Sequence, residues 1–255
     1  MSDQKNTYVV VSGSSSGLGM ALANKLSEKT GHYVYGLDKN AAPSNLARKK
    51  NYQHIKCDVS DLKNNQSVME PLSKLSKIDV LINNAATIKP SLLSDLELPE
   101  FEEVIEVNFK SAFLLTKALL PKLNSSEDAP HVFNIGSTAG VFGAPYSAPY
   151  VCSKAALHGL TLAINSENEF FGRLKATTLN LSPMMTPMNE RLQGWPGLWK
   201  ENNPTLLSCD DVAVLIVALI EMRRTLFIDS LVIRGRALNN DRELENPLIS
   251  GLKTN

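Results

Sequence analysis

The 255-residue sequence contains few of the residues that build metal centres and disulfide frameworks. Its three cysteines, Cys57, Cys152 and Cys209, are far apart and odd in number, and its four histidines are equally scattered. Neither set has the short, repeated spacing of a zinc site or of a disulfide-stabilised domain. No metal is therefore expected, and a reducing, cytoplasmic environment is favoured.

The sequence also lacks an excess of charge and a long apolar run. It has 26 basic and 26 acidic residues, so its net charge favours neither nucleic acid nor an anionic membrane as a partner. No apolar run approaches the ~20 residues of a membrane-spanning helix. The first residues, MSDQKN, are polar, unlike the apolar core of a secretory signal. With 43% hydrophobic and 20% charged residues, the chain has the composition of an ordinary globular protein.

Short apolar segments alternate with longer segments of helical periodicity. Strands are expected at residues 7–12, 32–37, 53–57, 79–82, 131–135, 176–181 and 226–233. Helices are expected at residues 18–29, 68–75, 99–123, 150–171 and 210–223. This alternation predicts an α/β fold, a single doubly wound domain over residues 1–255 with a seven-stranded, mostly parallel sheet and helices on both faces. Residues 184–208, rich in Met, Pro, Gly and Trp, interrupt the alternation.

A glycine-rich turn, GSSSGLG, joins the first predicted strand to the first predicted helix. Its glycines allow a tight turn and a close approach of the backbone to a pyrophosphate, which the free N–H groups of the helix start would bind. The spacing GxxxGxG differs from the familiar GxGxxG, and Gly-Ser segments are often simple loops. The position between strand and helix nevertheless favours a dinucleotide site. Its expected residues are Gly13, Ser15, Ser16, Gly17, Leu18 and Gly19.

Asp38 ends the second predicted strand. A carboxylate there accepts hydrogen bonds from ribose hydroxyls and repels a 2′-phosphate, which favours NAD over NADP. An aspartate in a turn after a strand is an equally good interpretation, and Lys39 beside it would tolerate a phosphate.

Further candidates follow the third and fourth predicted strands. Asp58 and Val59 follow the third, and Asn84 and Ala85 follow the fourth. Both pairs lie at carboxyl ends of strands, where an open parallel sheet binds ligands. Asp58 is placed to meet an adenine amino group, whereas Asn84 would equally satisfy the backbone of its own loop.

Three residues near the fifth strand form a candidate catalytic group. Ser137 follows that strand, and Lys154 lies four residues after Tyr150, on the same face if Tyr150 begins a helix. A phenol ionises near pH ~10, but a nearby ammonium and a cationic nicotinamide ring would lower that pKa. Ser137 would hold the substrate oxygen beside Tyr150. Taken singly, each residue also has an ordinary structural interpretation.

Together these residues resemble the short-chain dehydrogenase/reductase family over residues 7 to about 187. The residues that carry the resemblance are Gly13, Gly17, Gly19, Asp58, Asn83, Asn84, Ala85, Asn108, Ser137, Tyr150 and Lys154. The resemblance implies a Rossmann-type fold and hydride transfer between NAD(H) and a carbonyl or secondary alcohol. It makes Tyr150 the acid/base, Lys154 the residue that lowers its pKa and binds the nicotinamide ribose, and Ser137 the group that orients the substrate.

The family pattern implies further roles and shows two departures. Asn108 would hold a water that relays protons from Lys154. Cofactor contacts are also implied at Pro183 and Thr186, where Thr186 would meet the nicotinamide carboxamide. Ala86 and Met184 stand where the family usually has glycine, and Met184 lacks glycine's backbone freedom. The long helices at 101–123 and 150–171 suggest a homodimer or homotetramer through a four-helix contact.

Substrate choice is expected to lie in residues 184–208 and 139–147. Their apolar and aromatic residues favour an uncharged hydrophobic ketone or secondary alcohol, although they would equally pack a lid onto the body. These residues are Val141, Phe142, Tyr146, Met185, Met188, Leu192, Trp195, Leu198 and Trp199. Arg191 alone would pair with a carboxylate, but is more often solvated. Two alternatives are a catalytically silent dinucleotide-binding regulatory protein on the same fold and an NADP-dependent reductase.

Overall fold

The computed structural model describes residues 6–62, 69–192 and 206–236, whose strands form one sheet in the order β3-β2-β1-β4-β5-β6-β7. All six strand pairings are parallel. The strands are β1 (Thr7–Ser12), β2 (His32–Asp38), β3 (Tyr52–Lys56), β4 (Val80–Asn83), β5 (His131–Ser137), β6 (Lys175–Leu181) and β7 (Ser230–Ile233). The predicted α/β fold with a seven-stranded sheet is confirmed.

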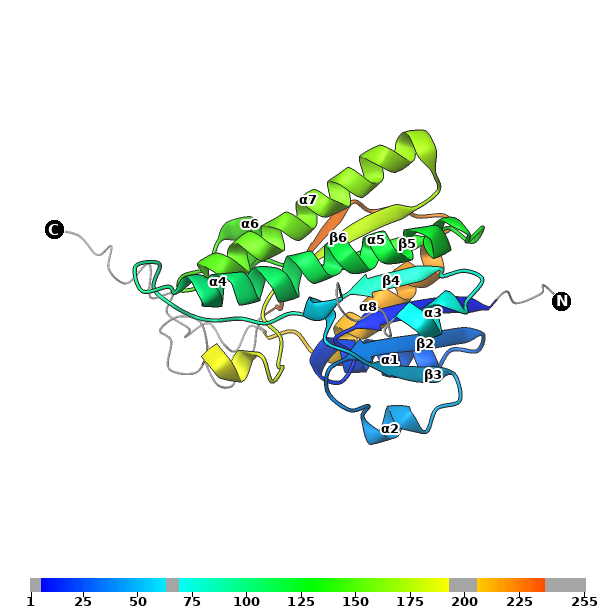
Figure 1. Ribbon diagram of the computed structural model, residues 1–255, viewed down its shortest axis with the longest axis horizontal. Coiled ribbons are helices and arrows are strands. Elements are labelled where there is room, and N and C mark those ends of the chain that lie inside the picture. The colour runs from blue at the N-terminus through cyan, green and yellow to red at the C-terminus, as the bar shows by residue number, and fades with distance from the viewer. Residues whose placement is uncertain (1–5, 63–68, 193–205, 237–255) are drawn as a thin grey trace.

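Helices cover both faces of the sheet, with α4, α5 and α7 on one side and α1 and α8 on the other (Figure 1). The helices are α1 (Gly17–Ser27), α2 (Ser44–Ala47), α3 (Met69–Ser73), α4 (Leu98–Ile105), α5 (Ser111–Asn124), α6 (Ala139–Phe142), α7 (Ala148–Phe171) and α8 (Cys209–Met222). Single helical turns are η1 (Val59–Asp61), the π-helical η3 (Glu106–Lys110) and η4 (Asn189–Leu192). No helix in the described part of the chain is long and apolar enough to cross a membrane.

The central strand β1 shows why an apolar run forms a strand here. Val9, Val10 and Val11 are all fully buried. Val9 and Val11 belong to the core cluster that includes α1 and α8, whereas Val10 packs with Leu115 of α5. Because successive side chains of a strand point to opposite faces, a sheet covered on both sides requires apolar residues at every position.

The order of the strands creates a crevice at the carboxyl end of the sheet. β1 lies between β2 and β4, so the chain builds the sheet outward from β1 in one direction and then resumes on its other side at β4. The connections after β1 and β4 consequently run to opposite faces, and ligands of doubly wound sheets bind in the resulting crevice.

Two predicted elements differ from the structure by more than small shifts of their ends. The helix expected at 99–123 consists of α4, η3 and α5, with Asn108 buried in the π-helical turn. The strand expected at 226–233 begins only at Ser230, because the N–H groups of Thr225 and Leu226 both donate to the Met222 carbonyl and form a turn after α8. The single domain over residues 1–255 stays a prediction.

Candidate active site

A cleft of about 730 Å³ lies at the carboxyl ends of the strands. It contains residues from the ends of β1 to β6 and from α7, which are far apart in sequence. The predicted site residues that line it are Gly13, Ser16, Gly17, Leu18, Asp38, Asp58, Val59, Asn84, Ala85, Ser137, Tyr150, Lys154, Pro183 and Thr186. Ser15, Gly19 and Asn108 do not line it directly. The structure therefore brings most of the residues singled out in the sequence to one cavity.

The glycine-rich turn is shaped by close backbone contacts. Gly13 and Gly17 have positive φ angles of 69° and 50°, a region that side chains other than glycine's rarely adopt. A Cβ atom at Gly19 would lie 2.0 Å from the Gly13 carbonyl oxygen. Only glycine at position 19 allows the first turn of α1 to pack against the end of β1.

The same turn has polar groups suited to a pyrophosphate. The Ser16 side chain makes no capping hydrogen bond at the start of α1, so the first N–H groups of the helix remain available to an anion. The Ser15 Oγ atom is buried without a partner among the described residues. A helix start that opens into the cleft, with the unpartnered Ser15 hydroxyl close behind it, fits a bound pyrophosphate.

The Asp38 carboxylate lines the cleft and also braces the turn. Its Oδ2 accepts a hydrogen bond from the Ser15 N–H at 3.0 Å, and its Oδ1 accepts one from the Asn40 N–H at 2.9 Å. Each carboxylate oxygen can accept more than one hydrogen bond. The backbone contacts thus leave Asp38 able to accept hydrogen bonds from a ligand.

Asp58 and Asn84 both use side-chain groups to hold backbone segments. Asp58 Oδ1 accepts hydrogen bonds from the Ser60 N–H and hydroxyl, and these bonds, with Lys39 nearby, hold the pKa of its carboxyl below the usual value despite burial. Asn84 Nδ2 donates to the carbonyl oxygens of Ser12 and Gly13 at 2.9 and 3.1 Å. Asn84 thereby ties the end of β4 to the glycine-rich turn, and its contact with a cofactor stays a prediction.

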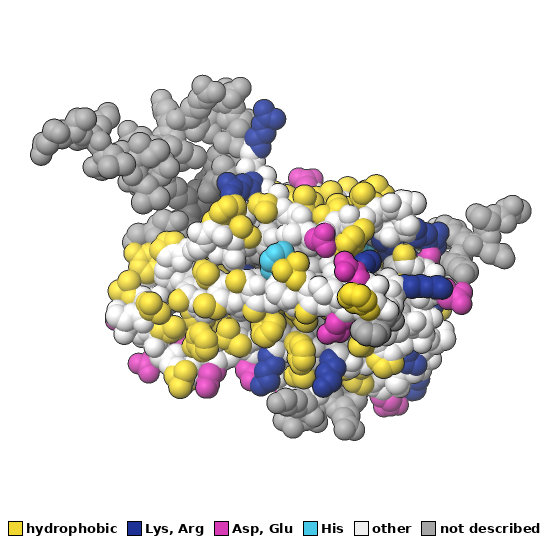
Figure 2. All heavy atoms as spheres, turned by 90° about the horizontal axis from the view of Figure 1, so that it is seen from above, with side chains coloured by type: hydrophobic (Ala, Val, Ile, Leu, Met, Phe, Trp, Pro, Cys, Tyr) yellow, Lys and Arg dark blue, Asp and Glu magenta, His cyan; other side chains and the backbone are white. Residues whose placement is uncertain are grey.

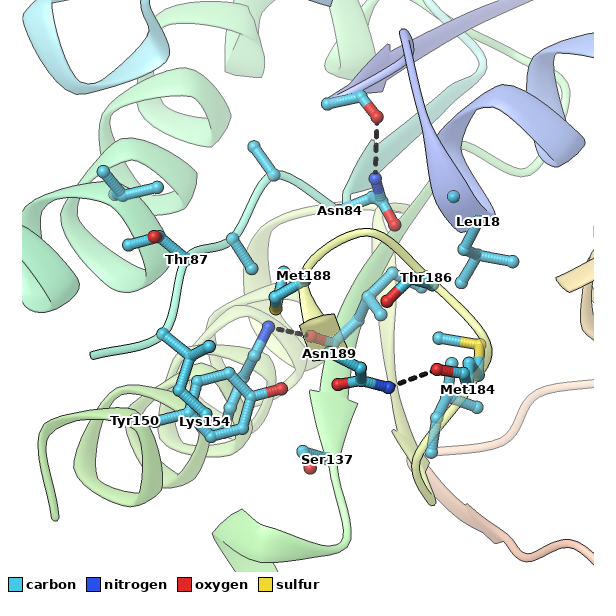
Figure 3. A pocket seen from close by; sticks show the side chains of 18 of the residues that line it. Leu18, Asn84, Thr87, Ser137, Tyr150, Lys154, Met184, Thr186, Met188 and Asn189 are labelled. Carbon is cyan, nitrogen blue, oxygen red and sulfur yellow. Dashed lines mark hydrogen bonds between the residues drawn. The ribbon is translucent and has the colours of Figure 1, made fainter. Parts of the chain in front are cut away.

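The catalytic candidates converge in the cleft (Figure 3). Tyr150 and Lys154 lie one turn apart on α7, with the Lys154 Nζ 5.6 Å from the centre of the Tyr150 ring. Lys154 is only 2% exposed, and its Nζ donates to the Ile135 carbonyl oxygen at 2.8 Å. Ser137 lies at the end of β5, where its Oγ accepts a hydrogen bond from the Ala139 N–H. The i, i+4 spacing thus directs both α7 side chains toward the end of β5.

Burial acts on the pKa values of Tyr150 and Lys154 in opposite directions. Desolvation raises the pKa of the Tyr150 phenol, and hydrogen bonding with Ser137 opposes that rise. Desolvation lowers the pKa of Lys154 to about 8. In both cases burial disfavours the charged form. Burial of the phenol thus opposes the lowering of its pKa that is expected from the Lys154 ammonium and a nicotinamide cation, and that lowering stays a prediction.

The pKa of Lys154 predicts a pH dependence of stability. Its pKa is lower in the folded chain than the ~10.4 of an exposed lysine, so the unfolded chain binds this proton more tightly between about pH 8 and about pH 10. Within this window the contribution of Lys154 to the free energy of unfolding rises with pH, by at most about 1.4 kcal/mol per pH unit. Urea denaturation of the wild type and Lys154→Met across the window should show the wild type gaining stability relative to the variant. Parallel curves would contradict the lowered pKa.

Asn108 bridges two parts of the site from behind the cleft. Its Oδ1 accepts a hydrogen bond from the Thr87 N–H at 2.7 Å, and its Nδ2 donates to the Thr87 carbonyl and to Ser153 Oγ, both at 3.0 Å. The Ser153 hydroxyl donates to the Tyr150 carbonyl. Asn108 thereby links the loop after β4 to the helix that carries Tyr150 and Lys154. The predicted water relay stays a prediction.

The segment after β6 forms the wall opposite the loop after β4. Asn189 Nδ2 donates to the Met184 carbonyl, and the Leu207 N–H donates to the Pro183 carbonyl at 3.0 Å. Met184 lines the cleft and also packs against the core near α1 and α8. Met188 and Leu192 line the cleft as well, whereas Met185 is exposed and does not.

Several predicted substrate residues do not reach this cleft or are not described. Val141 and Phe142 are exposed, and Arg234 lies 4.4 Å over the Phe142 ring. Tyr146 lies in a neighbouring shallow pocket. Trp195, Leu198 and Trp199 lie outside the described residues, as does the side chain of Arg191.

Some residues that line the cleft were not predicted from the sequence. They are Leu37, Asn40, Cys57, Thr87, Ile88, Glu103, Val107, Ile135, Gly136, Thr138, Leu181 and Ser182. Asn40, Thr87 and Ile88 follow predicted site residues closely, so their proximity was the available signal. Glu103 and Val107 lie on α4 and η3, and only the packing of this helical region against α7 brings them near.

The fold and the cleft define a dinucleotide-binding oxidoreductase of the Rossmann type. A family model described as short chain dehydrogenase matches residues 7–197, and the chain belongs to that family. It is an oxidoreductase that uses NAD(P)(H).

Known proteins with a similar sequence or structure agree with this membership. An uncharacterized oxidoreductase of Staphylococcus epidermidis is 28% identical over 193 residues, which cover 74% of this chain and 83% of the relative. The structure of 4-hydroxyisoleucine dehydrogenase complexed with NADH is 26% identical, with a TM-score of 0.78, and the match covers 90% of this chain and 98% of the other. An alcohol dehydrogenase from Thermococcus sibiricus, complexed with 5-hydroxy-NADP, shares the fold at 21% identity and a TM-score of 0.76, with 92% and 100% covered.

Proposed function

We propose that the protein transfers hydride between NAD(H) and an uncharged, hydrophobic small molecule with a carbonyl or secondary alcohol group. The observation that carries the proposal is the convergence of Ser137, Tyr150 and Lys154 in the same cleft as the glycine-rich turn. The nicotinamide, when bound, supplies or takes up the hydride. The residues of the chain bind and orient the reactants and move the proton.

Tyr150 is the proposed acid/base. In the direction of carbonyl reduction, the raised pKa of the buried phenol keeps a proton available for the developing alkoxide. In the direction of alcohol oxidation, the phenol must lose that proton first, and the nearby Lys154 ammonium and a nicotinamide cation favour its loss. Ser137 orients the substrate oxygen toward the phenol, and Asn108 serves the proton relay.

The positions of the residues in the cleft support an assignment of each to one part of the cofactor. The turn from Gly13 to Gly19 and the start of α1 bind the pyrophosphate, and Asp38 accepts hydrogen bonds from the adenosine ribose. Asp58 and Val59 lie beside the adenine, Asn84 and Ala85 beside the sugars, and Pro183 and Thr186 beside the nicotinamide. The structure of 4-hydroxyisoleucine dehydrogenase with NADH supports a bound NAD(H) in this fold, whereas the 5-hydroxy-NADP complex keeps NADP as the alternative.

Preference for NAD(H) depends on Asp38 in this proposal. Asp38→Ala is expected to weaken NADH binding by about 10-fold to 100-fold, because it removes a charged acceptor from the ribose. NADPH binding should weaken far less or improve, since repulsion of the 2′-phosphate is lost. Titration calorimetry with both nucleotides measures the change. Asp38→Asn removes the charge but keeps one acceptor oxygen, which can retain one of the two contacts with the Ser15 and Asn40 N–H groups, so it separates loss of charge from loss of the whole side chain. Equal weakening of both nucleotides by Asp38→Ala would refute the repulsion argument.

The substrate end of the cleft has mostly apolar walls. Met184, Met188 and Leu192 come from one side, and Ala144 and Pro145 from the other. Asn189 lines the same wall but uses its amide N–H on the Met184 carbonyl. This lining supports a hydrophobic ketone or secondary alcohol.

A panel of ketones and secondary alcohols, followed by NADH absorbance at 340 nm, tests the proposed reaction. Turnover of apolar members in preference to charged ones is the expected result. Tight binding of NADH with no turnover across a broad panel would instead favour the catalytically silent regulatory protein. A preference for carboxylate-bearing substrates would contradict the proposed substrate class.

The helices α5 and α7 also support a homodimer or homotetramer. Figure 2 shows apolar side chains on the surface seen from above, the side on which α7 lies in Figure 1. Phe113 on α5 and Leu162 on α7 are exposed large apolar residues, and a contiguous patch of exposed apolar residues marks an interaction surface. A sizing experiment that finds only monomer at micromolar protein would contradict this assembly. A cytoplasmic location remains part of the proposal, since Cys57, Cys152 and Cys209 are all free thiols.

A further inference from the structure

A closed circuit of hydrogen bonds lies behind the wall of the cleft near Asp38. Ser14 Oγ is 3.2 Å from the Tyr52 hydroxyl, which is 3.3 Å from His54 Nδ1. His54 Nε2 is 2.9 Å from the Asn40 carbonyl oxygen. The Asn40 N–H and the Ser15 N–H both donate to the Asp38 carboxylate, and the peptide bond between Ser14 and Ser15 closes the circuit.

The chemistry of the groups fixes the direction of these bonds when His54 is neutral. A carbonyl oxygen only accepts, so His54 Nε2 carries the proton and donates to Asn40. His54 Nδ1 is then an acceptor, and the Tyr52 hydroxyl donates to it. The Tyr52 oxygen in turn accepts from the Ser14 hydroxyl. Every side-chain group of the circuit thus has a partner that matches it.

The circuit depends on the absence of a side chain at Gly36. Gly36 of β2 pairs with His54 of β3. A Cβ atom at Gly36 would lie 2.2 Å from the Tyr52 hydroxyl and 2.5 Å from Ser14 Oγ. The Ser14–Tyr52 contact therefore passes over β2 at the one position where the strand has no side chain.

The circuit joins the two backbone segments that hold Asp38. Ser14 and Tyr52 are buried and His54 is half-buried, and none of the three lines the cleft formed by the described residues. Asp38, Lys39 and Asn40 do line it. The bond from His54 restrains Asn40 on one side of the carboxylate, and the bond from Tyr52 restrains the Ser14–Ser15 turn on the other. A carboxylate held from both sides cannot easily swing away to admit a bulky anion.

We infer that Ser14, Tyr52 and His54 are positioning residues that set the discrimination between NAD(H) and NADP(H) by holding Asp38 in place. The inference rests on the proposed use of NAD(H). It predicts that loosening the circuit lets Asp38 move, so that the penalty against a 2′-phosphate falls while the ribose contact weakens. The effect on the ratio of the two affinities distinguishes this role from a purely structural one, which would lower both affinities together.

The test measures dissociation constants of NADH and NADPH by titration calorimetry for the wild type, Tyr52→Phe and His54→Phe. Tyr33→Phe is the matched control, because Tyr33 lies on β2 near the opposite end of the strand and outside the circuit. The ratio of the NADPH constant to the NADH constant should fall about fivefold in each circuit variant, the effect expected from one hydrogen bond. The control should keep the wild-type ratio.

In the double variant Tyr52→Phe/His54→Phe, the ratio of the NADPH constant to the NADH constant should fall little further than in either single variant, because both changes break the same circuit. Thermal unfolding at the assay pH checks that each variant is folded. Because His54 is only half-buried, His54→Phe should disturb the core less than Tyr52→Phe. If the ratio of the two dissociation constants in both circuit variants lies within about twofold of the control ratio, the inference is overturned and the proposed function still stands. A wild type that binds NADPH as tightly as NADH would overturn it as well, and a wild type that binds neither nucleotide would overturn the proposed function.

Discussion

Replacement of Tyr150 by Phe is expected to reduce turnover by about 10²-fold to 10⁴-fold, the usual contribution of a positioned general acid or base. The variant removes only the hydroxyl that would deliver or accept the proton, and leaves the ring beside Lys154. NADH binding should change little, since Tyr150 is one of many residues that line the cleft. Initial rates on an active substrate from the panel, together with a NADH titration, measure both quantities.

The pH profile provides a second readout for the same variant. Wild-type reduction should decline as pH rises through the raised pKa of the Tyr150 phenol, because the proton donor is lost. The residual rate of Tyr150→Phe should lack this decline. Cys152→Ser, a change of an exposed thiol on the same helix, is the matched control and should retain the wild-type rate. Turnover by Tyr150→Phe near the wild-type level would refute the assignment of Tyr150.

The sequence predicts the layered fold because its signals are local. β1 is a run of apolar residues with Val9, Val10 and Val11 buried on both faces, and such a run indicates a strand covered on two sides. The π-helical turn around Asn108 has no comparable signal, because the partners of the Asn108 amide, Thr87 and Ser153, lie 21 and 45 residues away in the sequence. The start of β7 at Ser230 likewise depends on the turn that follows Met222.

Some residues of the candidate site can likewise be predicted from local sequence signals, and others cannot. The spacing of Tyr150 and Lys154 and the glycines of the first turn indicate their positions, since one turn of helix and one strand-to-helix connection suffice to place them. The circuit through Tyr52 and His54 was not predictable, because it depends on the register of β2 and β3 and on the absence of a side chain at Gly36. His54 in the sequence is one of four scattered histidines. Burial raises the pKa of Tyr150, and this effect has no signal in the sequence because burial is a property of the folded chain.

Stability of the sheet should depend strongly on an ion pair far from the cleft. Asp128 precedes β5, and its carboxylate accepts hydrogen bonds from Arg223 Nη2 at 2.7 Å and from Arg224 Nε. The side chains of Asp128 and Arg223 are 7% and 4% exposed, whereas that of Arg224 is 57% exposed. Arg223 also donates to the Asp128 and Ile220 carbonyls. These contacts fasten the end of α8 to the start of β5.

Asp128→Ala is therefore expected to lower the free energy of unfolding by about 3–5 kcal/mol, because it leaves the buried Arg223 guanidinium without its counterion. Arg224→Ala, which removes the exposed partner, should cost at most about 1 kcal/mol. Urea denaturation at neutral pH compares the two variants. A cost for Asp128→Ala no greater than that for Arg224→Ala would contradict the buried pair as a main contact between α8 and β5.

The pH dependence supplies an independent check on the same pair. Hydrogen bonding and the charges of the two arginines hold the pKa of Asp128 below its usual value, despite burial. A carboxyl whose folded pKa is depressed contributes stability above its unfolded pKa of ~3.9 and loses it as pH falls toward the folded value. The stability difference between the wild type and Asp128→Ala should thus be full at neutral pH and narrow below about pH 4. NADH affinity at neutral pH should remain unchanged in folded Asp128→Ala, since Asp128 lies outside the cleft. This result would separate the role of Asp128 in holding the fold from the role of Tyr150 in the chemistry.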